Sequence, residues 1–265
     1  MKSYLKQNRA VVNLSLLAYG LLLTIVWFTP VAFSGYLKVD SSARWWYLLS
    51  ESGGVVGSAV ILSTTSLVVA LSYDTITAKL KQFTLILIGF VCLLASCAFL
   101  NEYVIKHLIK KERPSHAYLS KNAKDILPDI TEFYLRDEKA RTLFLEDRLK
   151  LYESEVADIY PPVLKHWIKE SGYSFPSGHS ENSFLLATLI ALLIYNYNAA
   201  YKFYAFIPYL WAVAVCSSRV AIGVHSAFDV SLGALAGILI ATLIGVLNLH
   251  KYIIPQKRQT KSANT

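Results

Sequence analysis

The sequence has few charged residues and very little cysteine. Only 17% of its 265 residues are charged, and three are cysteines. Cys92, Cys97 and Cys216 all lie in apolar stretches, and no histidine stands at a ligand-like spacing from them. We therefore expect no structural disulfide and no metal site, and we interpret the cysteines as packing residues.

Strict alternation of polar and apolar residues is also missing. Hydrophobic residues make up 54% of the chain and gather in long continuous runs, a pattern typical of membrane-spanning α-helices rather than strands. We predict an all-α polytopic membrane protein, with residues 1–265 forming a single membrane-embedded domain. The six expected transmembrane spans lie near residues 10–33, 53–72, 83–105, 183–197, 203–222 and 229–249.

The first apolar run follows a basic start, Met1-Lys-Ser-Tyr-Leu-Lys-Gln-Asn-Arg9, which a signal peptide would also have. Because the run is long and no convincing small-residue cleavage site follows it, we expect a retained first span.

The distribution of charge between the spans predicts their orientation. If the N-terminus is cytoplasmic, the cytoplasmic segments hold ten basic residues and one acid, Asp74, whereas the loop 106–179 holds 13 basic and 12 acidic residues. The positive-inside rule then places both termini in the cytoplasm and the loop outside. The net charge of +8 does not indicate nucleic-acid binding, because the basic residues flank spans instead of forming one patch.

Residues 114–175 form the expected extramembrane insertion, between the third and fourth spans. Asp129-Ile-Thr-Glu132 resembles a capping box, and the apolar positions after it suggest one imperfect amphipathic helix that ends at Pro161-Pro162. Residues 163–169 are aromatic and basic, which suits a bilayer surface. The insertion is either an ordinary cap packed on the helices or a lid that admits lipid headgroups.

A short turn, Phe175-Pro-Ser-Gly-His-Ser180, stands directly before the fourth apolar run. Gly178 frees the backbone, and the residues after it can open a helix whose first amide groups have no internal partner and can hold an anion. His179 can give or take a proton near neutral pH. Taken alone, the turn also fits a purely structural role.

Two other stretches have charged residues at helical spacing. Lys106 and Arg113 are seven residues apart, so they share a face if one continuous helix carries both. His225 and Asp229 are four residues apart and would meet in the same way. With six spans, both stretches and the glycine-containing turn fall on the outer side of the membrane.

In order, the three stretches read K-x6-RP, PSGH and SR-x5-H-x3-D. They resemble the three-part signature of the type 2 phosphatidic acid phosphatase superfamily, and every fixed position of the three motifs matches. The resemblance implies an enzyme that removes phosphate from lipids through a phosphohistidine intermediate, without a metal or other cofactor. Its implied partners are lipid phosphates and the bilayer, with no nucleic acid and no obligate protein partner.

The resemblance also implies roles for single residues. His225 would be the nucleophile, Asp229 would hold one imidazole nitrogen protonated, and His179 would protonate the leaving group. The implied phosphate-binding residues are Lys106, Arg113, Arg219, Ser177 and Gly178.

The insertion narrows the resemblance to a Gram-negative branch of the superfamily, on residues 129–149 and 166–175. That branch acts on phosphatidylglycerol phosphate and undecaprenyl pyrophosphate, which implies an inner-membrane protein with a periplasmic active site. Alternatives with the same site are a lipid phosphotransferase and a lipid A phosphatase. A transporter is a non-enzymatic alternative, but the charges lie at span ends rather than within spans.

Four histidines outside the signature, His107, His116, His166 and His250, are expected on the surface. Two carboxylates are expected close to the site residues. Glu102 precedes Lys106 by one helical turn and is expected to pair with it, and Glu181 is expected near His179.

Overall fold

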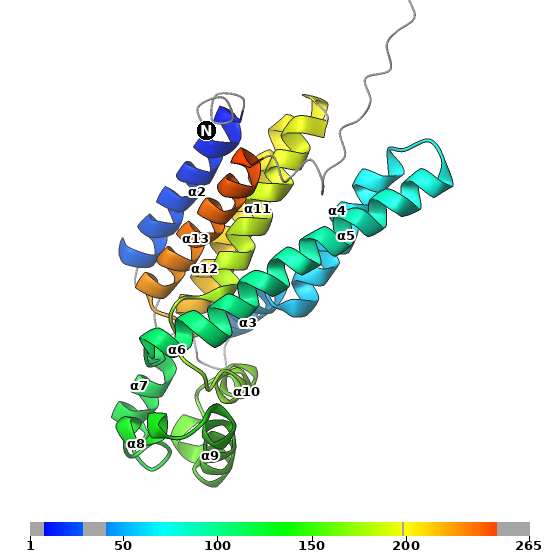
Figure 1. The fold of residues 1–265 in the computed structure, drawn as a ribbon. Helices are drawn as coiled ribbons and strands as arrows, with labels where there is room; N and C mark the ends of the chain where they lie inside the picture. Colours follow the sequence, from blue (N-terminus) through cyan, green and yellow to red (C-terminus); the bar gives the residue numbers. More distant parts are fainter. Residues whose placement is uncertain (1–7, 29–40, 198, 248–265) are drawn as a thin grey trace, which may run out of the picture.

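In the computed structural model, residues 8–28, 41–197 and 199–247 are described, and every regular element among them is a helix (Figure 1). The elements of the N-terminal half are α2 (Arg9–Phe28), α3 (Ser41–Ser52), α4 (Val55–Leu71), α5 (Ile76–Phe99), the π-helix η1 (Leu100–Ile105) and α6 (Lys106–Ile109). Those of the middle segment are α7 (Pro114–Asn122), α8 (Ile130–Leu135), α9 (Glu138–Leu151), η2 (Glu153–Val156) and α10 (Pro161–Lys169). The last are α11 (Gly178–Tyr197), η3 (Ala199–Phe206), α12 (Ile207–Ala221) and α13 (Ala227–Val246).

Four helices, α2, α11, α12 and α13, pack side by side as a bundle (Figure 1). Their shared core is apolar, and Leu185 of α11, Ala212 of α12 and Ala234 of α13 are fully buried in it. Helix α11 contacts the other three and also α5. The start of α11 is thereby held firmly among its neighbours.

Small residues let α13 approach α11 closely. A side chain at Gly233 would collide with the carbonyl oxygen of Ser177, and one at Gly237 would collide with that of Glu181. These two glycines therefore fix the distance between α13 and the turn that opens α11.

Helices α4 and α5 form a second unit, and Figure 1 shows them diverging from the bundle. The expected second span, 53–72, falls in α4, and α3 precedes it at a bend of 57°. At this bend the chain turns through Gly53 and Gly54, which separate the helices. Thr75 caps α5 by accepting a hydrogen bond from the Ala78 amide at 3.2 Å.

In the part of the chain that the structure describes, four helical segments are long and apolar enough to cross a membrane, or five if the bent pair counts as one span. They are 9–28, 76–109, 202–221 and 227–246, with 42–71 as the bent pair. The expected fourth span falls in α11, which starts within the PSGH turn. Because its first two turns are polar, α11 is not among these four apolar segments. Residues 29–33 and 248–249 of the expected first and sixth spans lie outside the described residues.

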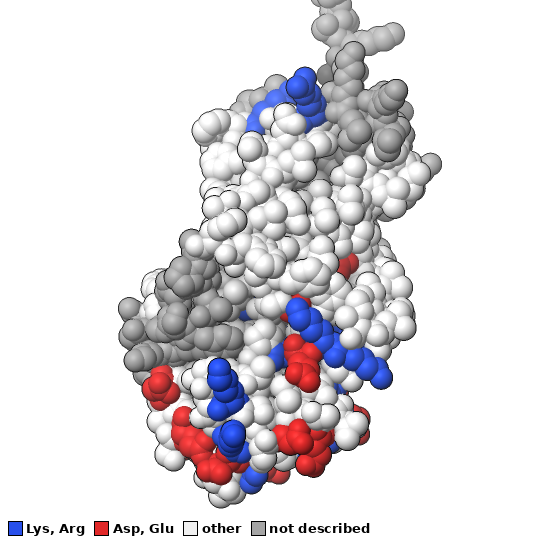
Figure 2. Space-filling view, turned by 90° about the vertical axis from the view of Figure 1, so that its left-hand side faces the viewer, with Lys and Arg blue, Asp and Glu red and all other residues white. Residues whose placement is uncertain are grey.

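Figure 2 shows how charge is distributed on one face of the molecule. Charged residues gather towards the two ends, and the middle is nearly all uncharged, drawn in white. Exposed apolar side chains are also abundant on the long helices, among them Leu17, Leu80 and Leu243. Both features fit helices surrounded by lipid.

Residues 114–175, with helices α7 to α10, form a cap at the end of the bundle opposite to the start of α2 (Figure 1). Its own core includes Phe133, Leu145 and Trp167, all almost fully buried. The Trp167 indole donates a hydrogen bond of 2.7 Å to the carbonyl oxygen of Ile222, which joins the cap to the loop between α12 and α13.

The prediction of one amphipathic helix in this segment is wrong. Asp129 does cap a helix, accepting hydrogen bonds from the Thr131 and Glu132 amides, but that helix stops at Leu135. Asp137 then caps a second helix, α9, because its side chain accepts from the Ala140 amide at 2.8 Å. Pro161 begins α10 rather than ending a helix, as suits proline in a first turn.

Candidate active site

The PSGH turn opens α11 as the sequence predicts. The helix begins at Gly178, and the Ser177 amide donates to the carbonyl oxygen of Asp229 at 3.2 Å, which ties the turn to α13. The Ser177 hydroxyl oxygen accepts from the Ser180 hydroxyl at 3.0 Å. Ser177 and Gly178 thus lie at a helix N-terminus, where backbone amides can receive an anion.

Lys106 and Arg113 do not lie on one continuous helix, which is the arrangement that would place them on a shared face. The helix ends at Ile109, and Lys110 adopts the left-handed conformation, with φ 51°. Arg113 therefore lies on the loop that leads into α7 and shares no continuous helix with Lys106. Its guanidinium donates to the carbonyl oxygens of Gly172 at 3.0 Å and Val224 at 3.1 Å, so contacts with distant segments orient it.

Lys106 follows the π-helix η1 and is buried. Its ammonium pairs with Glu102 at 2.6 Å, and this confirms the predicted partner one turn earlier. The second carboxylate expected near the site, Glu181, accepts a hydrogen bond of 2.6 Å from the Asn101 side chain in η1.

Arg219 stands in the last turn of α12 with no exposed surface. Its guanidinium contacts the Ser50 hydroxyl at 2.6 Å and the His166 ring nitrogen Nε2 at 2.8 Å. Its carbonyl oxygen accepts from the His225 amide at 3.2 Å. Arg219 therefore contributes its charge and also shapes the loop that carries His225.

Glu170 joins the two arginines. One carboxylate oxygen lies 2.8 Å from Arg113 Nη2, and the other lies 2.7 Å from Arg219 Nη2. The burial of Glu170 alone would raise its pKa, but Arg219 and Arg113 outweigh this effect and hold the pKa well below its usual range. A carboxylate thus lies between two guanidinium groups, an arrangement suited to any oxyanion with two oxygens to share.

His225 lies beside this pair of arginines, with Nε2 3.5 Å from Arg113 Nη1. Its other ring nitrogen, Nδ1, lies 3.9 Å from Asp229 Oδ2 and is buried without a hydrogen-bond partner. Burial lowers the pKa of His225 well below its usual value, and the positive charges of Arg113 and Arg219 lower it further. The imidazole is therefore neutral at pH 7, with one nitrogen facing the arginines.

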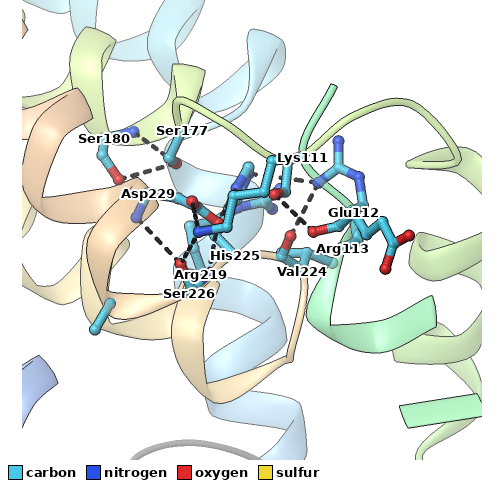
Figure 3. A network of polar contacts seen from close by, with 12 residues as sticks. Lys111, Glu112, Arg113, Ser177, Ser180, Arg219, Val224, His225, Ser226 and Asp229 are labelled. Atoms are coloured by element: carbon cyan, nitrogen blue, oxygen red, sulfur yellow. Dashed lines mark hydrogen bonds and ion pairs between the residues drawn. The ribbon is translucent and has the colours of Figure 1, made fainter. Parts of the chain in front are cut away.

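Asp229 is fully buried in the first turn of α13. It forms a capping box with Ser226, whose amide donates to Oδ2 at 2.8 Å. Its other oxygen, Oδ1, accepts from the Lys111 ammonium at 2.6 Å. Figure 3 shows Lys111, Asp229 and Ser226 joined by these contacts, with His225 next to them. Asp229 is near His225, as expected, but the two residues form no hydrogen bond. The carboxylate accepts its hydrogen bonds from Lys111 and Ser226 instead.

His179 lies in the first turn of α11 and is partly exposed. Its Nε2 lies next to Gly54, at 3.6 Å from where a Cβ atom on that residue would stand, so the bend between α3 and α4 borders the site. The structure therefore brings together residues from all three sequence stretches at the end of the bundle that the cap covers.

Several residues of this site have no place in the sequence motifs. Glu170, Lys111 and His166 are missed, and the only signal for them is nearness in sequence to PSGH or Arg113. The prediction that His116 and His166 lie on the surface is wrong, because both are buried. Burial, with Arg219 adding to it, lowers the pKa of His166 to about 4. His107 is exposed as expected, and His250 lies outside the described residues.

The described residues include no group of three or more histidine, cysteine, aspartate or glutamate side chains that could hold a metal ion. The three cysteines are free thiols, of which Cys97 and Cys216 are buried and Cys92 is exposed on α5.

A bundle of apolar helices with buried arginines, histidines and carboxylates at one end is typical of a membrane protein, and the two arginines could bind an oxyanion. The model of the PAP2 superfamily matches residues 83–251, and the chain belongs to this superfamily. It is 27% identical over 249 residues to phosphatidylglycerophosphatase B of Haemophilus influenzae, covering 90% of this chain and 97% of the relative.

Relatives of the same name show a shorter match. Phosphatidylglycerophosphatase B of Escherichia coli K12 is 28% identical over 140 residues, which is 53% of this chain and 48% of the relative. The match to the Shigella flexneri protein has the same identity and extent. Together, the family and these names support lipid phosphatase activity in a membrane protein.

Proposed function

We propose that this protein is an integral membrane phosphatase that hydrolyses phosphatidylglycerol phosphate, undecaprenyl pyrophosphate or both, with phosphatidic acid as a further substrate. The lipid products are phosphatidylglycerol, undecaprenyl phosphate and, from phosphatidic acid, diacylglycerol, and each reaction releases orthophosphate. The observation that carries the proposal is the Glu170 carboxylate held between Arg113 and Arg219, with His225 Nε2 3.5 Å from the Arg113 guanidinium. A phosphoryl group has the charge and oxygen spacing to take the place of that carboxylate.

Binding begins when the substrate phosphate displaces Glu170 from the arginines. Arg113 and Arg219 then share its oxygens, and Lys106 adds a third positive charge. Ser177 and the amides around Gly178, at the start of α11, supply hydrogen bonds to the same group.

The chemistry proceeds in two displacements at phosphorus. Neutral His225 attacks through Nε2, the bond to the lipid oxygen breaks, and His179 gives that oxygen a proton. Water then attacks the phosphohistidine and gives a proton to His179, which releases orthophosphate and restores both histidines. Asp229 favours the required tautomer by accepting a hydrogen bond from the Nδ1–H group, for which the 3.9 Å separation from Oδ2 must shorten.

The proposal includes no metal ion and no other cofactor. Lys106, Arg113 and Arg219 already supply three positive charges at the phosphoryl group, which is the contribution that a divalent cation makes in other phosphoryl-transfer enzymes. The partners are lipid phosphates and the bilayer, with no nucleic acid and no obligate protein partner.

We further propose six spans, formed by α2, the bent pair α3–α4, α5 to α6, α11, α12 and α13. Both termini are cytoplasmic, and the active site faces the periplasm of a bacterial inner membrane. The balanced charge of loop 106–179 and the excess of basic residues in the opposite loops support this orientation. The cap 114–175 belongs to the single domain 1–265, because its Trp167 is bound to the loop between α12 and α13.

A direct test is to assay the purified protein against a panel of phospholipids and undecaprenyl pyrophosphate, with and without a chelator of divalent cations. We expect orthophosphate release from the lipids above, with undiminished rates after chelation. Transfer of phosphate to a second lipid instead of water would indicate a phosphotransferase, and preference for lipid A would indicate that alternative substrate. A requirement for added magnesium would contradict the proposed chemistry.

A further inference from the structure

Asp229 directs its hydrogen bonds away from His225. The carboxylate is completely buried, and its two oxygens accept from the Lys111 ammonium at 2.6 Å and the Ser226 amide at 2.8 Å. His225 Nδ1, 3.9 Å from Oδ2, has no hydrogen-bond partner. A buried nitrogen without a partner is costly, so the contacts of Asp229 must be strong enough to keep it in this position.

Lys111 differs from the other cations of the site in exposure and in attachment. Its side chain is 35% exposed, whereas those of Lys106 and Arg113 are 7% and 2% exposed. The backbone of Lys111 is fixed, since its carbonyl oxygen accepts from the Ser174 amide at 2.9 Å. Its ammonium also donates to the Ser226 hydroxyl at 2.8 Å and lies 5.2 Å from the centre of the Phe228 ring. Lys111 thus bridges the loop before Arg113 and the start of α13.

The charge of Asp229 matters to His225 because a carboxylate beside an imidazole favours the protonated ring. A protonated His225 cannot act as a nucleophile. An ammonium bonded to the same carboxylate offsets that influence. The charged and titratable groups that act on His225 from the surrounding elements are Arg113, Arg219, Lys106, Glu170, Asp229 and, through Asp229, Lys111.

We propose that Lys111 is a positioning residue, which binds Oδ1 of Asp229 and compensates the charge of that carboxylate, so that His225 enters the reaction neutral. The inference rests on the proposed function, in which His225 is the nucleophile. Lys111 itself touches neither His225 nor the phosphoryl group in this account and acts only through Asp229.

The test compares the pH dependence of kcat/KM for wild type and Lys111→Met, with one lipid phosphate monoester throughout. The substrate ionises identically in both assays. A difference in the acid limb, where kcat/KM falls at low pH, therefore reports ionisation of the enzyme. Without the ammonium, the charge of Asp229 acts on His225 uncompensated and favours the protonated ring, so we expect the acid limb to move to higher pH by about 1 unit. Lys111→Arg, which keeps the charge, should retain the wild-type limb. The exposed neighbour Lys110 provides the matched control, Lys110→Met.

A second pair of variants guards against a purely structural effect. In an Asp229→Asn background, no buried charge is left unpaired when Lys111 is replaced. If Lys111 acts through Asp229, Asp229→Asn and the double variant should have the same acid limb. An unmoved limb in Lys111→Met, or an equal shift in both backgrounds, would overturn the inference. Absence of lipid hydrolysis by the wild type would instead overturn the proposed function.

Discussion

At the residue scale, Glu170 occupies the place that the proposed chemistry assigns to phosphate. Its carboxylate contacts Arg113 and Arg219 at 2.8 and 2.7 Å. Two buried arginines without an anion would be strongly unfavourable, so Glu170 stabilises the empty site. The same contacts oppose substrate binding, because the phosphate must replace them.

Glu170→Gln should therefore bind orthophosphate more tightly than wild type. The amide is neutral and competes less well for the arginines, so we expect the inhibition constant for orthophosphate to fall roughly tenfold, or by ~1.4 kcal/mol. Competitive inhibition of lipid hydrolysis measures this constant. Glu132→Gln, at a carboxylate that is 67% exposed and paired with Arg136 on the cap, is the control. Unchanged or weaker phosphate binding in Glu170→Gln would show that phosphate does not replace this carboxylate.

Single residues also show where sequence reasoning succeeds and where it stops. Spacing and resemblance select Arg219, His225 and Asp229, and these residues do converge, because the loop between α12 and α13 is short. Glu170, by contrast, belongs to the cap and meets Arg219 across 49 residues of sequence. No local pattern encodes such a contact, since tertiary packing creates it.

At the element scale, the long apolar helices are predictable because their runs are continuous. The bend of 57° between α3 and α4 is not, since it depends on tertiary contacts such as that at Gly53, where a side chain would collide with Val215. The end of the helix at Ile109 is likewise hidden, because Lys110 takes a left-handed conformation that lysine rarely adopts. The sequence predicts that the cap is helical, but its apolar positions indicate one helix, whereas Asp129 and Asp137 each begin a separate helix.

The cap contains a buried histidine that should make stability depend on pH. His116 in α7 has no exposed surface, and its Nδ1 lies 2.7 Å from the Tyr134 hydroxyl. Burial lowers the pKa of His116 from 6.5 to about 3, and Arg113 adds to this effect. His116 therefore binds a proton below pH 6.5 in the unfolded chain, but only below about pH 3 in the folded protein. Stability is lost as pH falls through this window, by up to about 1.4 kcal/mol per pH unit.

His116→Gln keeps a side chain that can form hydrogen bonds but cannot titrate. We expect its Tm in detergent to fall less than that of wild type between about pH 7 and pH 4.5. Thermal unfolding at a series of pH values measures the difference, and His107→Gln, at an exposed histidine, should behave like wild type. An equal fall in His116→Gln and wild type would mean that His116 is not buried in its neutral form.

At the scale of the whole molecule, the orientation rests on charge. The residues of the candidate site gather at the end of the bundle that the cap covers, opposite to the start of α2 (Figure 1). A reporter that is active only in the periplasm should work when inserted within residues 115–170 and fail when fused after Lys257. The reverse pattern would place the active site in the cytoplasm.

The central claim is that His225 carries the phosphoryl group. The most direct measurement is to react the protein with a lipid labelled at the transferred phosphate, quench in alkali, where phosphohistidine survives, and map the label. We expect label on His225 of the wild type, with no label there and turnover reduced by on the order of 10³-fold or more in His225→Ala. His107→Ala, at an exposed histidine outside the site, should retain both label and turnover. Label on another residue, or substantial turnover by His225→Ala, would contradict the account.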